Sequence, residues 1–169
     1  MILPKLIVFD RDGVLNVSSK DESSPFYYIL EHSNLIIKPN VREALQIIRA
    51  LQIPSVLATK QRCVSKGLIG RERLATMNCR LERLCEFEFD QIYVEEIEET
   101  KLNLYKKIMA DYPRLNLQDI WLFDDSEELA EWARAALAAA QRAALRKRPK
   151  ARKAAKSIGM GARAARSGK

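Results

Sequence analysis

The sequence predicts an α/β fold of three layers, in which a mostly parallel central sheet lies between layers of helices. Apolar runs of strand length recur four times in the 169 residues, and segments with helical spacing of apolar residues follow them. Strands that alternate with helices of this length form parallel sheets, and right-handed crossovers then produce a doubly wound arrangement. The chain length suits one domain with a substantial core.

The first third of the chain contains the first expected strand and the first expected helix. Residues 3–9 form an apolar run and are the strand. Residues 17–38 contain many polar residues, Pro25 and an aromatic cluster at 26–28, and they are expected to form a loop or a small hairpin. A helix is expected over residues 39–51, because Pro39 suits the first turn of a helix and apolar residues follow at helical spacing.

The rest of the chain repeats this alternation of strands and helices. Leu74, Met77 and Leu81 have the spacing of one apolar helix face. Ser126 can cap the last helix. The remaining strands are expected at 53–58, 89–94 and 119–123, and the remaining helices at 71–85, at 102–112 and from residue 126 onward.

Charge divides the chain into two parts. Residues 1–132 hold all 22 acidic residues and 17 of the 29 basic residues, a net charge of −5, whereas residues 133–169 hold the other 12 basic residues. We therefore expect a folded domain over residues 1–132. Residues 133–169 are expected to be an Ala/Arg/Lys-rich tail that is helical at first and disordered beyond Pro149.

Several protein classes are excluded by composition. No stretch reaches the roughly 18 apolar residues of a membrane span, and the short apolar start lacks the features of a signal peptide. We expect a cytoplasmic protein with no membrane partner. Cys63, Cys79 and Cys85 lack the paired spacing of a zinc site or disulfide framework, so we expect buried free thiols and no zinc.

Two aspartates directly follow the first expected strand. Asp10 and Asp12 end this apolar run, and Gly13 comes next. A carboxylate at the end of a buried strand is costly unless it is compensated, and a divalent cation with hard oxygen ligands, such as Mg²⁺, is the usual compensation. Open parallel sheets also bind ligands at the carboxyl ends of their strands. A surface turn would explain Asp12-Gly13 but not the apolar run that leads to Asp10, so the sequence predicts a metal-dependent site.

The stretch from Phe9 to Asn16 resembles motif I of the haloacid dehalogenase (HAD) superfamily, whose members are aspartate-nucleophile phosphohydrolases. It is most similar to the capless branch that holds heptose-bisphosphate and histidinol-phosphate phosphatases. The resemblance implies a Rossmann-like, HAD-like fold with no large cap domain, and residues 17–38 would then be a small flap beside the site.

Two further stretches resemble the second and third motifs of this family. Thr59 ends the second expected strand and matches motif II, whereas Lys60 stands where the family usually has asparagine. Lys101 resembles the lysine of motif III. A solvated surface lysine is the simpler interpretation of Lys101, but its place just before a helix favours it over Lys106 and Lys107.

Asp124 and Asp125 follow the fourth expected strand and resemble the acidic pair of motif IV. The family usually has Gly-Asp there, so Asp125 is expected to be the direct Mg²⁺ ligand and Asp124 to replace the glycine. Both are candidate metal ligands together with Asp10 and Asp12. The resemblance implies that Mg²⁺ is held by the carboxylates of Asp10 and Asp125 and by the backbone carbonyl of Asp12.

The resemblance also implies the catalytic roles. Asp10 would be the nucleophile and form an aspartyl-phosphate, and Asp12 would protonate the leaving oxygen and later deprotonate the water that cleaves the intermediate. Thr59 and Lys101 would hold the phosphoryl oxygens. Contacts with the substrate are assigned to four neighbouring residues: Arg11, Gly13, Lys60 and Gln61.

Three functions remain open at the level of sequence. The first is a phosphatase that acts on a sugar phosphate or a similar small metabolite, and the second is a polynucleotide 3′-phosphatase. The third is a catalytically impaired binding module, which Lys60 would favour and the intact Asp10/Asp12 pair disfavours.

The basic tail admits three interpretations of its own. It can bind nucleic acid weakly and without sequence preference, because it has many cations but no aromatic residue for stacking on bases. It can also be a disordered appendage. Finally, it can be a replaced C-terminus, because nothing there resembles the final strand of the family.

Overall fold

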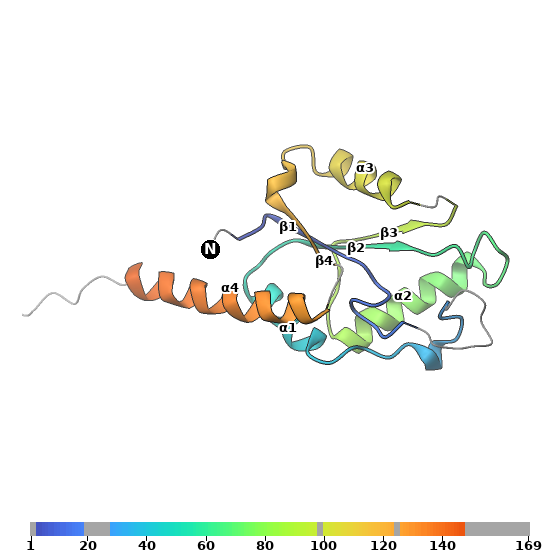
Figure 1. Ribbon diagram of the computed structural model, residues 1–169, viewed down its shortest axis with the longest axis horizontal. Coiled ribbons are helices and arrows are strands. Elements are labelled where there is room, and N and C mark those ends of the chain that lie inside the picture. Colours follow the sequence, from blue (N-terminus) through green and yellow to red (C-terminus); the bar gives the residue numbers. More distant parts are fainter. Residues whose placement is uncertain (1–2, 19–27, 98–99, 124–125, 148–169) are drawn as a thin grey trace, which may run out of the picture.

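In a computed structural model of the chain, the described residues form one sheet with helices on both faces (Figure 1). The structure describes residues 3–18, 28–97, 100–123 and 126–147. The sheet has four strands, all parallel, in the order β3-β2-β1-β4. Their bounds are β1 (Leu6–Phe9), β2 (Ser55–Lys60), β3 (Gln91–Glu95) and β4 (Ile120–Phe123). The predicted three-layer α/β fold with a parallel central sheet is confirmed.

Strand β1 is the centre of this sheet. Val8 pairs with Val56 of β2 on one side and with Leu122 of β4 on the other. All four residues of β1 are at most 2 % exposed, as expected of a strand that is buried on both faces. Because side chains alternate along a strand, Ile7 and Phe9 face one layer of helices and the other two residues face the opposite layer.

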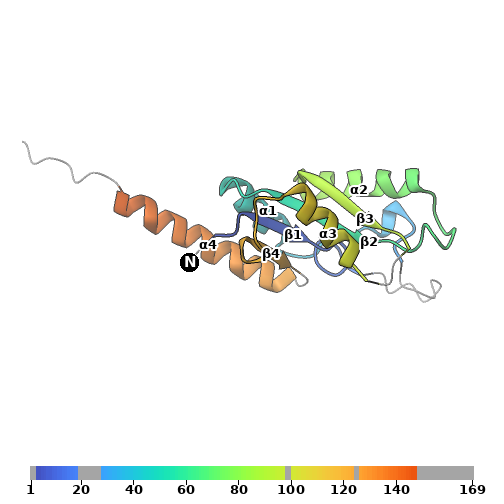
Figure 2. The ribbon, with the colours of Figure 1, turned by 90° about the horizontal axis from the view of Figure 1, so that it is seen from above.

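Among the described residues, three α-helices lie on one face of the sheet and one lies on the other (Figure 1; Figure 2 shows the same arrangement from above). The first face carries α1 (Val41–Ala50), α2 (Arg71–Cys85) and α4 (Ser126–Lys147), and the second carries α3 (Leu102–Asp111). The chain moves outward from β1 to β2 and β3, and then returns across the sheet to β4. Because right-handed crossovers in opposite directions lie on opposite faces, this return places α3 opposite α1 and α2.

Each face has its own core. The larger core joins Phe9 with α1, α2 and α4 through residues such as Leu45 and Leu81. The smaller core joins Val8 with α3 through Leu104. Side chains of β1 belong to both cores, so packing on both faces of the sheet fixes the position of this strand.

Helix α4 continues across residue 132, where the composition of the chain changes. Ala133 and Ala136 are fully buried, and the helix packs against α1. Arg134 Nη2 lies 3.0 Å from Glu43 Oε2 of α1. The first turns of the Ala/Arg/Lys-rich segment therefore belong to the packed core, while residues 148–169 lie outside the described residues.

The two ends of the segment at residues 16–37, which follows β1, pair with each other. Asn16 forms an antiparallel bridge with Ile37, and the backbone NH of Val17 donates to Ile36 O at 2.8 Å. A short 3₁₀-helix, η1 (His32–Asn34), lies within the described part. Of the aromatic cluster, Tyr28 packs against the core and residues 26–27 lie outside the described residues.

Some expected boundaries were wrong by a few residues. Helix α1 begins at Val41 rather than Pro39, because Asn40 has a left-handed backbone (φ 65°) and separates the proline from the helix. Strand β2 begins at Ser55, two residues later than expected. Cys63 and Cys85 are buried free thiols as predicted, but Cys79 is exposed on the surface of α2.

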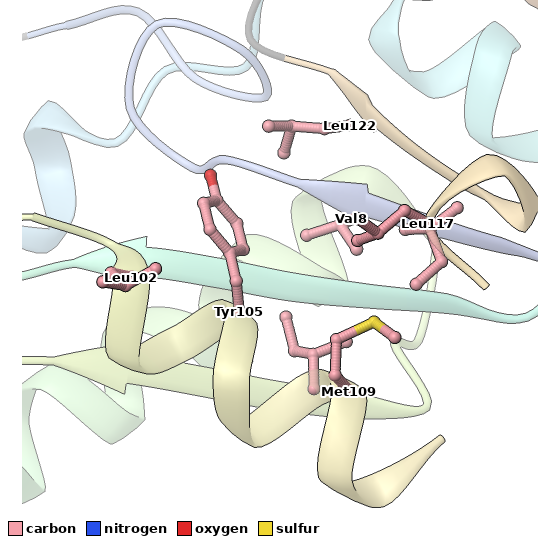
Figure 3. Close-up of a pocket in the computed structure, with 8 residues that line it drawn as sticks. Val8, Leu102, Tyr105, Met109, Leu117 and Leu122 are labelled. Atoms are coloured by element: carbon pink, nitrogen blue, oxygen red, sulfur yellow. The ribbon is translucent and has the colours of Figure 1, made fainter. Parts of the chain in front are cut away.

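An apolar pocket of about 360 Å³ lies beside α3 (Figure 3). Val8 and Leu122 line it from the sheet, Tyr105 and Met109 line it from α3, and Leu117 closes one end. None of the candidate catalytic residues lines this pocket. Within the described part of the chain, no helix combines the length and the apolarity needed to cross a membrane.

We predict that a chain truncated after Arg148 keeps its fold, because the buried residues of α4 precede this point. Its thermal midpoint, followed by circular dichroism, should change by less than about 3 °C, which corresponds to under roughly 1 kcal/mol. A control truncation after Glu131 also removes Trp132, Ala133 and Ala136, and it should destabilise the domain by several kcal/mol. A large fall in the midpoint of the longer chain would show that residues 149–169 contribute to the core.

Candidate active site

The candidate site lies at the carboxyl ends of β1 and β2. Strand β1 is followed along the chain by β2 on one side, whereas β4 on its other side comes last. The connection that leaves β1 runs to β2 on one side, whereas the connection from β3 returns across the sheet to β4 on the other side. Open α/β sheets bind ligands at such a switch point. Asp10 directly follows β1 at this point, and its backbone NH lies 3.3 Å from Phe123 O at the end of β4.

Asp10 faces a lysine from the other side of the sheet. Its Oδ2 forms an ion pair with Lys101 Nζ, and its Oδ1 accepts a hydrogen bond of 2.8 Å from the backbone NH of Arg11. Lys101 directly precedes α3, so the helix places the ammonium at the strand ends. Both side chains are 21 % exposed, so the pair is held by the protein and is still open to a ligand.

Asp12 is held by four hydrogen bonds from three side chains. Arg11 Nε donates to Oδ1 at 3.2 Å and Arg11 Nη2 donates to Oδ2 at 3.0 Å. Asn16 Nδ2 donates to Oδ1 at 2.9 Å, and Gln61 Nε2 donates to Oδ2 at 2.6 Å. Burial raises the pKa of Asp12, but the charge of Arg11 and the four hydrogen bonds outweigh this effect and lower the pKa below its ordinary value.

Thr59 and Gln61 lie at the end of β2, next to Asp12, and both are 1 % exposed. Gln61 Nε2 donates to Thr59 Oγ1 at 2.8 Å in addition to its bond with Asp12. The Thr59 hydroxyl is an acceptor in this bond, so its proton is available for another oxygen. Lys60, between them, is partly buried and lies opposite Glu95 of β3 in the register.

The loop after Asp12 is tied down at Gly13. Its backbone has φ 88°, a left-handed conformation that other residues rarely adopt, and an added Cβ would lie 3.2 Å from Ser18 Oγ. Lys38 Nζ donates to Gly13 O at 2.8 Å, and the Gly13 NH donates to Asn16 O at 2.8 Å. These bonds fix the backbone that follows Asp12 and place the ammonium of Lys38 at the Gly13 carbonyl.

Arg11, which the sequence assigns to substrate binding, has its side chain inside the protein. Its side chain is 1 % exposed and points into the protein, where Nη1 donates to Asn78 Oδ1 of α2 at 3.2 Å. The other side of the guanidinium holds Asp12. The guanidinium of Arg11 is therefore occupied by contacts within the protein, and its expected contact with a substrate stays a prediction.

The expected metal ligands are described only in part. Asp10 and Asp12 lie together at the strand ends, whereas Asp124 and Asp125 lie outside the described residues. Among the residues that the structure describes, no group of three or more His, Cys, Asp or Glu side chains could hold a metal ion. The Asp10 carboxylate offers the hard oxygen ligands that suit Mg²⁺.

Three polar residues of this site were given no role from the sequence: Asn16 at the end of the motif I stretch, Asn78 and Lys38. Asn78 lies next to Met77, within the apolar stripe of α2, and is only 4 % exposed. A buried amide needs a partner, so an asparagine on an apolar helix face was a readable signal of a polar contact. Lys38 lacked such a signal, because lysine is common in surface loops.

Comparisons with known proteins agree with this geometry at the level of the fold. No family model matches the chain, and no curated protein matches it. Among solved structures, the D,D-heptose 1,7-bisphosphate phosphatase of B. bronchiseptica, complexed with magnesium and phosphate, is 18 % identical. The match covers 80 % of this chain and 99 % of that one, with a TM-score of 0.61. The chain has the HAD-like fold.

A second phosphatase of the same name, from Burkholderia thailandensis, is 23 % identical. That match covers 78 % of this chain and 72 % of the other, with a TM-score of 0.47. The B. bronchiseptica structure is the one that carries the assignment of the fold. The HAD-like fold without a large cap was predicted from the resemblance of the strand-end motifs and is confirmed.

The hydrogen bonds to Asp12 predict a dependence of stability on pH. Because the pKa of Asp12 is lowered in the folded state, the unfolded chain binds its proton more readily. This contribution to stability is present above the unfolded pKa of about 4 and is lost as the pH falls through the folded value. Asp12→Asn should therefore reduce the difference in the free energy of unfolding between pH 6 and pH 3, measured by urea titration in EDTA. An unchanged difference would contradict the role of this network.

Proposed function

We propose that this protein is a phosphomonoester hydrolase whose nucleophile is Asp10. The observation that carries the proposal is the position of the Asp10 carboxylate, which follows the central strand and faces Lys101 while staying partly open to solvent. Asp12, Thr59 and Gln61 are joined by hydrogen bonds at the ends of β1 and β2, and they supply further groups that this chemistry needs. The likeness in fold to a heptose-bisphosphate phosphatase that was crystallised with magnesium and phosphate supports the proposal.

The reaction has two steps, because phosphate monoesters hydrolyse extremely slowly without help. In the first step an Asp10 carboxylate oxygen attacks phosphorus, the bond to the ester oxygen breaks, and that oxygen takes a proton from Asp12. In the second step water attacks the aspartyl-phosphate and gives its proton to Asp12. Orthophosphate leaves, and the Asp10 carboxylate is regenerated.

The environment of Asp12 fits both steps. Its lowered pKa favours the ionised form, which accepts a proton from water in the second step. A phosphate dianion bound beside it opposes this ionisation, because like charges raise the pKa of a carboxyl group. Substrate binding therefore shifts the pKa of Asp12 upward, in the direction that the first step needs.

Lys101 and Thr59 would hold the phosphoryl oxygens. The Lys101 ammonium already contacts Asp10 Oδ2, so it lies where the charge of the transferred group develops. The Thr59 hydroxyl can donate its proton to a phosphoryl oxygen while it accepts the bond from Gln61. Gly13 and Lys60 are the remaining proposed contacts with the substrate.

Mg²⁺ is the proposed cofactor. The carboxylates of Asp10 and Asp125 and the backbone carbonyl of Asp12 would hold it, with Asp124 beside them. When bound, a divalent cation offsets the repulsion between a carboxylate nucleophile and a phosphate dianion.

The proposed substrate is a sugar phosphate or a similar small metabolite, because residues 1–132 carry a net charge of −5 and would repel a polyanion. The 12 basic residues at 133–169 favour the alternative, a polynucleotide 3′-phosphatase. Phosphorylated sugars, amino-alcohol phosphates and 3′-phosphorylated oligonucleotides, each tested with Mg²⁺, would separate the two. Turnover of oligonucleotides alone would support the alternative.

Asp10→Asn should abolish phosphatase activity, because an amide cannot act as an anionic nucleophile at phosphorus. We expect turnover, measured as phosphate release with Mg²⁺, to fall roughly a thousand-fold or more. Circular dichroism should show an intact fold. A variant that keeps a substantial part of wild-type turnover would remove Asp10 from the role of nucleophile.

Lys101→Ala should lower kcat by roughly 10²- to 10³-fold, because the ammonium stabilises charge in the transition state. Lys106→Ala and Lys107→Ala are matched controls on the exposed surface of the same helix, and they should keep turnover near that of the wild type. Similar kcat values for all three variants would exclude Lys101 from the site.

A further inference from the structure

A fully buried arginine lies directly behind the candidate site. Arg11 is the largest of the fully buried side chains in the described part of the chain. A buried charge is costly unless it is paired and hydrogen-bonded, so the position needs a compensating reason. The proposed reaction gives Arg11 no contact with the substrate and no proton to carry.

Arg11 donates two hydrogen bonds to Asp12 and a third to Asn78. Nε and Nη2 donate to the two carboxylate oxygens of Asp12, at 3.2 and 3.0 Å. A two-point bond between planar groups determines the plane of the carboxylate as well as its position. A lysine could not form it, because its ammonium is a point charge on a flexible chain.

Asn78 anchors the guanidinium. Its Oδ1 accepts a hydrogen bond of 3.2 Å from Arg11 Nη1, the third nitrogen of the guanidinium, across a sequence separation of 67 residues. Asn78 is 4 % exposed and lies in the middle of α2. The orientation of the guanidinium, and through it that of Asp12, is therefore coupled to a helix that is packed into the main core.

Asn16 and Gln61 also donate to the Asp12 oxygens, and part of the Asp12 side chain remains open to solvent. This side chain is 33 % exposed, whereas that of Arg11 is 1 % exposed. The carboxylate is thus held from the interior and presented toward solvent, as a group that exchanges protons with a bound molecule must be.

We propose that Arg11 is a positioning residue, anchored by Asn78, that holds the Asp12 carboxyl group in the orientation from which it protonates the leaving oxygen. The inference rests on the proposed phosphatase function and adds to it a role for two residues that do not touch the substrate. It is an alternative to the expectation that Arg11 binds the substrate itself.

The leaving group provides a test that a purely structural role would not pass. An alkoxide needs a proton as it departs, whereas 4-nitrophenolate is stable enough to leave without one. Loss of proton donation should therefore affect alkyl phosphates more than 4-nitrophenyl phosphate. The ratio kcat/KM is the suitable measure, because it reports the steps up to the aspartyl-phosphate and is independent of its hydrolysis.

The experiment compares the full-length wild type with Arg11→Lys and Asn78→Leu on glycerol phosphate and 4-nitrophenyl phosphate, with Mg²⁺. We expect Arg11→Lys to lower kcat/KM roughly a hundred-fold for glycerol phosphate, within the usual range for general acid catalysis, and at least several-fold less for 4-nitrophenyl phosphate. Asn78→Leu should also lower kcat/KM more for glycerol phosphate than for 4-nitrophenyl phosphate, but by smaller factors than Arg11→Lys. If Arg11→Lys does not fold, Asn78→Leu carries the test, because it leaves the ion pair with Asp12 in place.

Arg42→Met is the matched control. Arg42 also makes a forked contact with α2, through Nε and Nη2 to Leu84 O at 3.1 and 2.6 Å, but far along the helix from Asn78. It should lower stability without changing the ratio between the two substrates. A change of that ratio in Arg42→Met would show that any loosening of α2 has the same effect, and would overturn the specific role of Arg11.

A double variant supplies the second measurement. In an Asp12→Asn background, Arg11→Lys should cause little further loss of kcat/KM for glycerol phosphate, because the group that Arg11 positions is already absent. Additive losses, or equal losses on the two substrates, would make Arg11 a structural residue only and overturn the proposal. A wild-type protein that hydrolyses neither substrate nor any other phosphomonoester would instead overturn the proposed function, on which the inference rests.

Discussion

The burial of β1 between two parallel neighbours is the constraint on which the rest of this structure depends. Its four apolar residues have no polar side chain to offer water, so both faces need a layer of helices. Pairing with β2 and β4 then satisfies its backbone on both edges. The first residue that leaves this environment is Asp10, which is therefore held at the centre of the carboxyl-end edge of the sheet.

The charges of the site are arranged around that point in two layers. Lys101, carried by α3, meets Asp10 from one face of the sheet, while Arg11 and Asn78 support Asp12 from the opposite layer. Each carboxylate has a cationic partner, but the first pair is partly open and the arginine of the second is buried. Under the proposed function, this difference suits Asp10 as the reacting group and Asp12 as the group whose orientation is fixed.

Helix α4 illustrates how packing and composition can disagree. By composition, residue 133 begins a basic segment with no acidic residues. Alanine is small and a strong helix former, so Ala133 and Ala136 can approach α1 closely, while Arg134 stays outside and pairs with Glu43. A change in charge along a sequence therefore need not coincide with the end of a core.

The sequence by itself determined the class of the fold, the identity of the elements and the strand-end residues that gather at the site. These follow from local patterns: the length of the apolar run before Asp10, the helical spacing around Met77, and polar residues at the ends of two strands. Among the residues expected at the site, Asp10 pairs with Lys101, and Gln61 joins Asp12 to Thr59.

Only the tertiary structure decided the order of the strands, the inward direction of Arg11 and its contact with Asn78. An arginine beside two aspartates has the same appearance in a sequence whether it faces the ligand or the core. Its direction depends on whether the interior offers it a polar partner. Here that partner is Asn78 of α2, 67 residues away in the sequence. Such contacts depend on which faces of the elements meet when they pack, and the local spacing of residues does not predict them.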